Sequence, residues 1–233
     1  MKVPVCVIVG AGPGNGAAFA RQFSRAGYRV ALLARGRDSL DALTAEIAGT
    51  RAYAYDAANP ADAERVFTAI RQDLGAPQTL IYNASTREFR DIDATTPDAF
   101  ERAWKVNTYG CLLAAQQVIP DMRAAGQGSI VIIGATASLK GAAGFVAFAS
   151  AKAAQRSLAQ SLARQLGPQG IHVAYVIIDA VVDMPASRAM LPDAPDTFFA
   201  RPDDIAESVF FLARQPRSAW TFELDLRPFG EHW

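Results

Sequence analysis

Short apolar runs rich in β-branched residues alternate along this chain with longer stretches of helical pattern, and this alternation constrains the fold more than any other feature. Strands are predicted at residues 3–9, 28–34, 51–55, 78–82, 129–133, 171–178 and 220–226. Helices are predicted at residues 14–26, 39–48, 61–74, 97–125, 145–166 and 202–213, the fourth being kinked or split at Pro120. Because parallel strands are joined by crossover connections that are usually helical, we expect an α/β fold with a doubly wound, seven-stranded parallel sheet in three layers.

The bulk composition narrows the functional classes. The 233 residues contain no internal repeat and no linker, so one domain spanning residues 1–233 is expected. The formal net charge is zero, which gives no reason to expect a nucleic acid or a membrane surface as a partner. Cys6 and Cys111 lie in apolar surroundings without ligand-like spacing, so we expect reduced core thiols and no metal site. The first residues lead directly into a strand, and no apolar span reaches about 18 residues, which predicts a cytoplasmic protein.

A glycine-rich turn joins the first predicted strand to the first predicted helix. Glycines permit positive φ and allow backbone N–H groups to approach a phosphate closely, while the helix N-terminus adds partial positive charge. In open α/β sheets ligands bind beyond the carboxyl ends of the strands, so the turn also has the right location. We therefore interpret it as part of a dinucleotide site of the Rossmann fold, the alternative being a purely structural tight turn. The turn consists of Gly10, Ala11, Gly12, Pro13, Gly14, Asn15 and Gly16.

The end of the second predicted strand bears on the choice between the two nicotinamide cofactors. An acidic side chain there would bind the ribose 2′-hydroxyl of NAD. This chain has Ala34, Arg35 and Arg37 in that region, and a guanidinium can pair with a 2′-phosphate through two hydrogen bonds. The sequence therefore favours NADP over NAD, although Arg37 taken alone is equally well explained as a solvated charge at a helix start.

The glycine spacing of the turn, GxxxGxG, resembles that of the short-chain dehydrogenase/reductase family, and the resemblance extends over nearly the whole chain. Asp56, followed by Ala57, resembles the acid that contacts the adenine in that family. Asn83 and Ala84 resemble the start of the family's Asn-Ala-Gly motif, whose third member is Ser85 here. The resemblance therefore implies that these residues line the cofactor site.

Residues 134–152 resemble the family's catalytic segment, in which a Ser precedes a Tyr by thirteen residues and a Lys follows that Tyr by four. Lys152 is present, but Phe148 stands at the Tyr position and Ala135 at the Ser position. The resemblance implies that Lys152 holds the nicotinamide ribose and that Asn107 steadies a water linked to this lysine. Phe has no proton to give and Ala has no hydroxyl, so ordinary carbonyl reduction is expected to be strongly impaired.

A different group is needed if the chain transfers protons. Asp179 follows the sixth predicted strand, where a desolvated carboxyl would lie near the nicotinamide, but an Asp there is more often a turn residue or a helix cap. Residues 183–200 are predicted to be a loop, and its apolar side chains suit either a lid over an apolar substrate or ordinary packing.

Two functions remain open at this point. The first is an NADP-dependent oxidoreductase with an altered proton-transfer site, acting on a small or medium apolar carbonyl or an activated alkene. The second is a catalytically weak or inactive NADP-binding protein that serves as a sensor, scaffold or partner subunit. The resemblance also implies a homodimer or homotetramer built on the two long helices.

Overall fold

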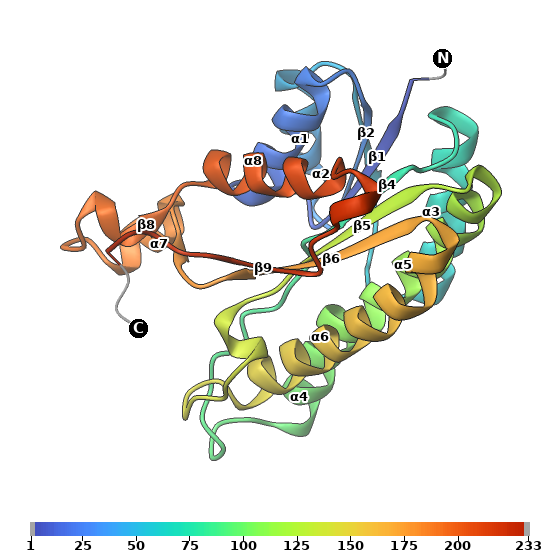
Figure 1. Ribbon diagram of the computed structural model, residues 1–233. Coiled ribbons are helices and arrows are strands. Elements are labelled where there is room, and N and C mark those ends of the chain that lie inside the picture. The colour runs from blue at the N-terminus through green and yellow to red at the C-terminus, as the bar shows by residue number, and fades with distance from the viewer. Residues whose placement is uncertain (1–2, 231–233) are drawn as a thin grey trace.

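The fold is organised around a sheet of seven parallel strands in the spatial order β3-β2-β1-β4-β5-β6-β9 (Figure 1). The computed structural model describes residues 3–230 of the chain. The expected doubly wound Rossmann-type α/β fold is confirmed. The strands of this sheet are β1 (Val5–Val9), β2 (Arg29–Ala34), β3 (Thr50–Ala54), β4 (Thr79–Tyr82), β5 (Gly128–Ile133), β6 (Ile171–Ile178) and β9 (Glu223–Leu226).

Helices cover both faces of the sheet and make the arrangement three-layered. One face carries α1, α2 and α8, and the opposite face carries α3, α5 and α6, with α4 beside α6 (Figure 1). A proline at the first position opens four of these helices, where the missing N–H costs nothing. The helices are α1 (Asn15–Arg25), α2 (Arg37–Glu46), α3 (Pro60–Asp73), α4 (Pro97–Trp104), α5 (Gly110–Ala125), α6 (Val146–Leu166), α7 (Pro185–Met190) and α8 (Pro202–Ala213).

The central strand β1 is buried on both sides, which explains its continuous apolar sequence. Successive side chains of a strand point to opposite faces, so Val5, Val7 and Val9 enter the core beneath α3, α5 and α6. Cys6 and Ile8 enter the other core, beneath α1, α2 and α8. A strand with both faces covered has no polar side to present to water, and the alternation typical of half-exposed strands is therefore absent.

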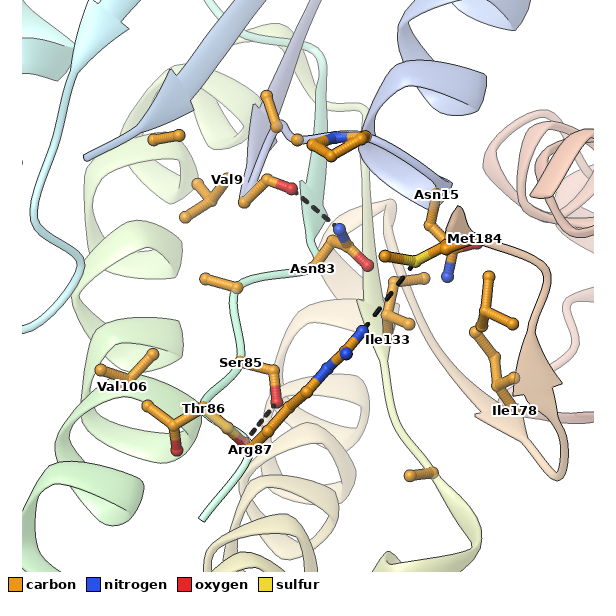
Figure 2. Close-up of a pocket in the computed structure, with 18 of the residues that line it drawn as sticks. Val9, Asn15, Asn83, Ser85, Thr86, Arg87, Val106, Ile133, Ile178 and Met184 are labelled. Atoms are coloured by element: carbon orange, nitrogen blue, oxygen red, sulfur yellow. Dashed lines mark hydrogen bonds between the residues drawn. The ribbon is translucent and has the colours of Figure 1, made fainter. Parts of the chain in front are cut away.

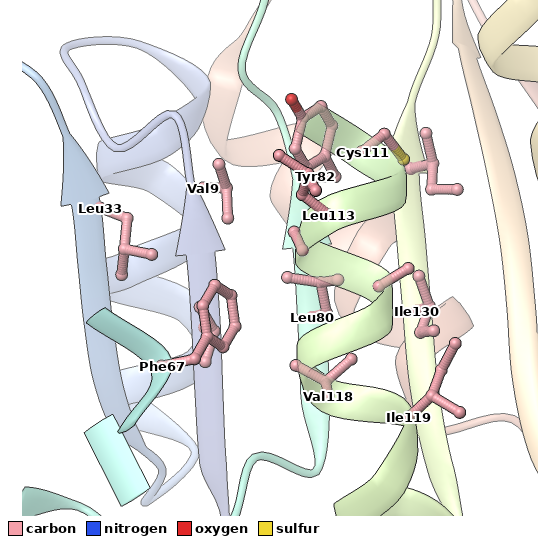
Figure 3. Close-up of a cluster of buried hydrophobic side chains, with 14 of the residues drawn as sticks. Val9, Leu33, Phe67, Leu80, Tyr82, Cys111, Leu113, Val118, Ile119 and Ile130 are labelled. Carbon is pink, nitrogen blue, oxygen red and sulfur yellow. The ribbon is translucent and has the colours of Figure 1, made fainter. Parts of the chain in front are cut away.

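The core beneath α3 and α5 shows how the helices are anchored (Figure 3). Phe67 of α3 and Val118 of α5 are fully buried and face the sheet, where Leu80 and Ile130 from β4 and β5 are also fully buried. Each side chain of this size contributes about 1.5–3 kcal/mol to folding when it is removed from water. This packing fixes the helices on the sheet and thereby fixes the loops at the carboxyl ends of the strands.

The segment predicted as one long helix consists of two α-helices joined by a π-helical turn, Lys105–Tyr109. The helix is not split at Pro120, because α5 continues through this residue to Ala125. The alternative, a kink at Pro120, stays a prediction. Arg71 of α3 supports the helix there: its Nε donates to Asp121 at 2.8 Å, and its Nη2 donates to a carbonyl in the same turn.

The interruption falls at Asn107, in the middle of the π-helical turn. The Asn107 side chain donates from Nδ2 to the carbonyl of Ala103 at 2.9 Å. Ala103 lies four residues earlier, so its carbonyl is the acceptor that the backbone N–H of Asn107 would use in an α-helix. The side chain thus takes the place of the backbone donor, and the turn widens around it.

Residues 183–200, predicted to be a loop, carry regular structure. They include α7, and Phe199–Ala200 (β8) pairs in parallel with Val181–Val182 (β7) in a second, two-stranded sheet. Arg188 stabilises the segment by donating to Asp183 at 2.7 and 2.9 Å and by packing on the ring of Phe199 at 4.1 Å. These partners are distant in sequence or polar, so local hydrophobic periodicity gives no sign of them.

None of the helices within residues 3–230 combines the length and the hydropathy that a membrane crossing requires.

Candidate active site

The principal cavity opens at the carboxyl ends of the strands, where the strand order changes direction. β1 pairs with β2 on one side and with β4 on the other, so the loops that follow β1 and β4 diverge and leave a crevice. The cavity has a volume of about 920 Å³, which is large enough for an extended cofactor and a small substrate. It is lined by the glycine-rich turn, the ends of β2, β4, β5 and β6, and the segment around α7.

The glycine-rich turn and the loop after β4 are locked together. Gly10 has φ +89°, and a Cβ on it would stand 2.5 Å from the backbone nitrogen of Ala84. Asn83 ties the two loops from the other side, since its Nδ2 donates to the Gly10 carbonyl at 2.9 Å (Figure 2). Only glycine satisfies both the positive φ and the close approach at this position. The predicted residues Gly10, Gly12, Pro13, Asn15, Asn83, Ala84 and Ser85 all line the cavity.

The cavity wall contains polar atoms that still need a partner. Asn15 begins α1 and is buried, and its Oδ1 has no hydrogen-bond partner among the described residues. The hydroxyl of Tyr55, which also lines the cavity, is likewise buried without such a partner. Unsatisfied buried polar atoms are rare in folded proteins and suit a ligand that carries hydroxyl and amine groups. Gly12 has open space where a Cβ would lie, so its backbone is accessible. These residues fit a dinucleotide.

The end of the cavity near β2 has one exposed arginine and one acid. Arg35 lines the cavity, and within residues 3–230 it makes no ion pair. Arg37 does not line the cavity and instead pairs with Asp41 at 3.2 Å on the surface of α2. Asp56 and Ala57 both line it, and Asp56 Oδ1 accepts a hydrogen bond from the Ala58 backbone at 3.0 Å. The structure therefore brings together all of the predicted residues at this end except Arg37.

Lys152 lies at the opposite end of the cavity and is only 3% exposed. Its Nζ donates to the Ile133 carbonyl at 2.8 Å and to Gln155 Oε1 at 3.1 Å. Burial lowers the pKa of Lys152 to about 8, an effect that the nearby Cys111 partly opposes. An ammonium has three donors, so one remains for a ligand in the cavity.

Gln155 connects Lys152 to Asn107. Its Nε2 donates to the Asn107 backbone carbonyl at 2.6 Å, while its Oε1 accepts from the lysine. The Asn107 side chain is held by Ser85, whose Oγ donates to Asn107 Oδ1 at 2.8 Å. It also reaches Thr86 at 3.3 Å. The π-helical turn, the loop after β4 and α6 thus form one hydrogen-bonded unit around the lysine.

Ala135 and Phe148 both line the cavity beside Lys152. The ring centroid of Phe148 lies 5.9 Å from the lysine nitrogen. The same ring makes an edge contact with Phe89, with the centroids 5.1 Å apart, and Phe145 contacts Phe89 at 5.0 Å with its centroid 6.3 Å from that of Phe148. These three rings form a cluster, called the phenylalanine cluster below, and two of them, Phe89 and Phe148, line this end of the cavity and make it apolar.

Asp179 does not line the cavity. Its Oδ1 accepts a hydrogen bond from the Thr136 hydroxyl, and its Oδ2 lies 3.5 Å from Arg227 Nη1. Both carboxylate oxygens are thus directed at Thr136 and Arg227, and neither faces the cavity. The speculative catalytic role of Asp179 therefore receives no support from its position. Gly14 and Gly16 also lie behind the cavity surface, within the turn itself.

Sequence reasoning missed three residues of this site. Gln155 lies three positions after Lys152, a spacing that places both side chains on one face of a helix and could have indicated the contact. Thr86 and Arg87 follow directly after the predicted cofactor residues of the loop after β4, and both line the cavity (Figure 2). Arg87 could have been predicted as a site residue, because it is basic and follows a central parallel strand at its carboxyl end.

The fold and the cavity are of the Rossmann type, in which ligands bind beyond the carboxyl ends of the strands. The sequence profile described as short chain dehydrogenase matches residues 4–189, so the chain belongs to the short-chain dehydrogenase family. A short-chain dehydrogenase from Rhodopseudomonas palustris is 35% identical, with 97% of this chain and 99% of that chain covered and a TM-score of 0.83.

Two further relatives bear on the site. A metagenomic short-chain oxidoreductase, solved in complex with NADP, is 26% identical, covers 99% of both chains and has a TM-score of 0.86. The 2-(R)-hydroxypropyl-CoM dehydrogenase of Xanthobacter autotrophicus is 29% identical over 231 residues, which cover 90% of each chain.

Proposed function

We propose that this protein is an NADP(H)-dependent oxidoreductase of the short-chain type with an altered proton-transfer site. The observation that carries the proposal is the position of Lys152, buried at the end of a dinucleotide-sized cavity with Ala135 and Phe148 as its neighbours. A lysine is seldom buried without a counter-charge unless it has a function, because its desolvation is costly. Here it has two uncharged acceptors and, within residues 3–230, no acidic partner.

The preference for NADP over NAD is supported by Arg35. Its guanidinium is exposed at the cavity wall and has no acidic partner among the described residues. A 2′-phosphate would supply such a partner, and the relative solved with NADP is consistent with this choice. The test is calorimetric titration of NADPH and NADH, in which the preference for NADPH should be lost in Arg35→Met. Equal affinity of the wild-type protein for both dinucleotides would contradict the preference.

A nicotinamide dinucleotide supplies the hydride for this class of reaction. The chain's own residues must then deliver or receive a proton, and neither Phe148 nor Ala135 has one to exchange. Lys152 does, since its lowered pKa of about 8 leaves the ammonium both populated and moderately acidic near neutral pH. We assign the one free donor of Lys152 to the cofactor ribose, and we propose that the proton reaches the substrate from the lysine through that ribose hydroxyl or a water. The contacts of Lys152 to the Ile133 carbonyl and Gln155 hold it in one orientation for both roles.

The substrate class follows from the lining of this end of the cavity. Phe89 and Phe148 of the phenylalanine cluster line one wall, and Val182, Met184, Met190 and Leu191 contribute apolar lining on the side of α7. Such a compartment favours a small or medium apolar carbonyl or an activated alkene over a sugar or a nucleotide. A panel of aldehydes, ketones and enones assayed with NADPH would test this, and turnover restricted to polar polyols would contradict it.

The second candidate function is a catalytically weak or inactive NADP-binding sensor, scaffold or partner subunit. The observation in its favour is the apolar surface that Ala135 and Phe148 present where a proton donor is needed. Tight NADPH binding without turnover across the substrate panel would support this function. Turnover that disappears in Lys152→Met would support the first.

We also propose a homodimer or homotetramer in the cytoplasm. Phe100 and Trp104 of α4 are 41% and 43% exposed, and α4 packs beside α6. Large exposed apolar side chains often mark a subunit interface. Light scattering after size-exclusion chromatography measures the assembly, and a monomeric wild-type protein would contradict the proposal. Fractionation of cells tests the location.

A further inference from the structure

We propose that Arg87 binds the pyrophosphate of the dinucleotide from the wall of the cavity opposite the glycine-rich turn. The inference rests on the proposed cofactor and adds a residue to its site. The turn at residues 10–16 contains no basic side chain, so its backbone N–H groups and the N-terminus of α1 are the only positive features that it offers. A pyrophosphate carries two negative charges, and a cation from elsewhere in the fold would complete the site.

Arg87 reaches the glycine-rich turn through one intermediate side chain. Its Nη2 lies 3.9 Å from Met184 Sδ (Figure 2). Met184 in turn lies directly over Gly14, since its Sδ is 2.6 Å from the point where a Cβ of residue 14 would stand. The arginine therefore extends from the loop after β4 across the crevice to the start of α1, which is the side where Asn15 lies in Figure 2.

No carboxylate competes for this guanidinium within residues 3–230. The adjacent Glu88 pairs with Arg90 at 3.8 Å and with Arg102 at 3.3 Å. Asp183, which follows β7, is taken by Arg188. A thioether is only a weak acceptor, so the contact with Met184 does not satisfy the charge of Arg87. An exposed cation that lines a cavity and has only a weak partner is suited to an anionic ligand.

The phosphate that Arg87 binds is distinguishable from the one assigned to Arg35. The pyrophosphate is present in both NADPH and NADH, whereas the 2′-phosphate is present only in NADPH. Loss of Arg87 must therefore weaken both dinucleotides by the same factor, and loss of Arg35 must weaken NADPH alone. Arg87 is exposed and not part of the core, so its replacement leaves folding intact.

The experiment is calorimetric titration of NADPH and NADH into the wild-type protein and four variants, with the melting temperature as a check on folding. Arg87→Met should raise both dissociation constants at least about tenfold, the usual scale for one hydrogen bond to a charged group. Arg87→Lys should recover part of that loss, since it keeps the charge but not the paired donors. Arg90→Met, on the same loop but outside the cavity, is the matched control and should bind like the wild type. Arg35→Met should raise only the constant for NADPH.

The outcomes separate the two proposals. Unchanged binding in Arg87→Met would overturn the role of this arginine while leaving the cofactor assignment in place, and so would a loss confined to NADPH. Failure of the wild-type protein to bind either dinucleotide would overturn both. Salt screens a contact between opposite charges, so the ratio of the dissociation constants of Arg87→Met and the wild type should fall as ionic strength rises.

Discussion

Restoring the two missing hydroxyls, with Phe148→Tyr and Ala135→Ser in one protein, should create carbonyl reductase activity. The Phe148 ring lines the cavity with its centroid 5.9 Å from Lys152 Nζ, so a phenol on the same ring would lie within the field of the ammonium. A neighbouring positive charge lowers the pKa of a phenol from about 10 and makes it a better proton donor near neutral pH. The exchange adds one oxygen to a ring that already faces the cavity, so packing against Phe89 should persist.

The expected gain can be bounded. A positioned general acid contributes about 10²–10⁴ in rate, and a hydrogen-bond donor to the developing oxyanion about 10²–10³. Groups that act as a unit are not additive, so the double variant should gain about 10²–10⁴ in kcat/KM on a simple apolar aldehyde. Each single substitution should gain much less than the pair.

The assay follows NADPH oxidation by absorbance with an aldehyde and a ketone series. Phe148→Leu is the matched control, because it alters the ring without adding a proton donor and should produce no gain. Adding Lys152→Met to the double variant should abolish the new activity. If the double variant binds NADPH normally, melts like the wild type and shows no increase, then Phe148 does not face the reacting oxygen and the reasoning is refuted.

Three further outcomes are expected from the same geometry. If Lys152 supplies the proton, kcat/KM should be constant at low pH and fall above pH 8, because burial lowers the pKa of Lys152 to about 8 and the protonated form is lost above that pH. A flat pH profile would exclude Lys152 as the acid. Gly10→Ala should lower the melting temperature by about 2–8 °C and weaken NADPH binding, because the new Cβ would clash with the Ala84 backbone and residue 10 has a positive φ. An unchanged melting curve would contradict the close approach. Gln155→Leu should lower the free energy of unfolding, measured with urea, by about 2–6 kcal/mol, because both Lys152 and the Asn107 carbonyl lose a hydrogen-bond partner. Gln155→Glu should lower it less, because the acceptor for Lys152 is kept.

Much of the fold was predictable because it depends on local pattern. The apolar run that became β1 and the proline-led helix starts act over a few residues, and the strands expected from them all appear in the sheet. Two of the failed predictions, both in the segment 97–125, have single side chains as their cause. Asn107 replaces a backbone donor with its own amide, and Pro120 is tolerated because Arg71, distant in sequence, supports that turn.

The site was predictable in part for the same reason. The glycine-rich turn, Asp56 and Lys152 could be placed because each follows a recognisable strand or lies in a recognisable helix, and all of them border the cavity or form its turn. Arg37 and Asp179 were less certain, and each lies outside the cavity with an ionic partner of its own, Asp41 and Arg227. A charged residue near a strand end is drawn to whichever opposite charge the tertiary fold brings closest, and a single sequence does not reveal which one that is.

The sequence alone determined the class of fold, the glycine-rich turn and the chemical identity of positions 135 and 148, because folding cannot supply a hydroxyl that the side chain lacks. Only the tertiary structure decided which groups surround Lys152 and where Arg87 extends. Gln155, the Ile133 carbonyl and Met184 come from different elements, and the contacts Lys152–Ile133 and Arg87–Met184 join residues far apart in the chain. Such contacts depend on how the loops of neighbouring strands meet above the sheet, which hydrophobic periodicity does not encode.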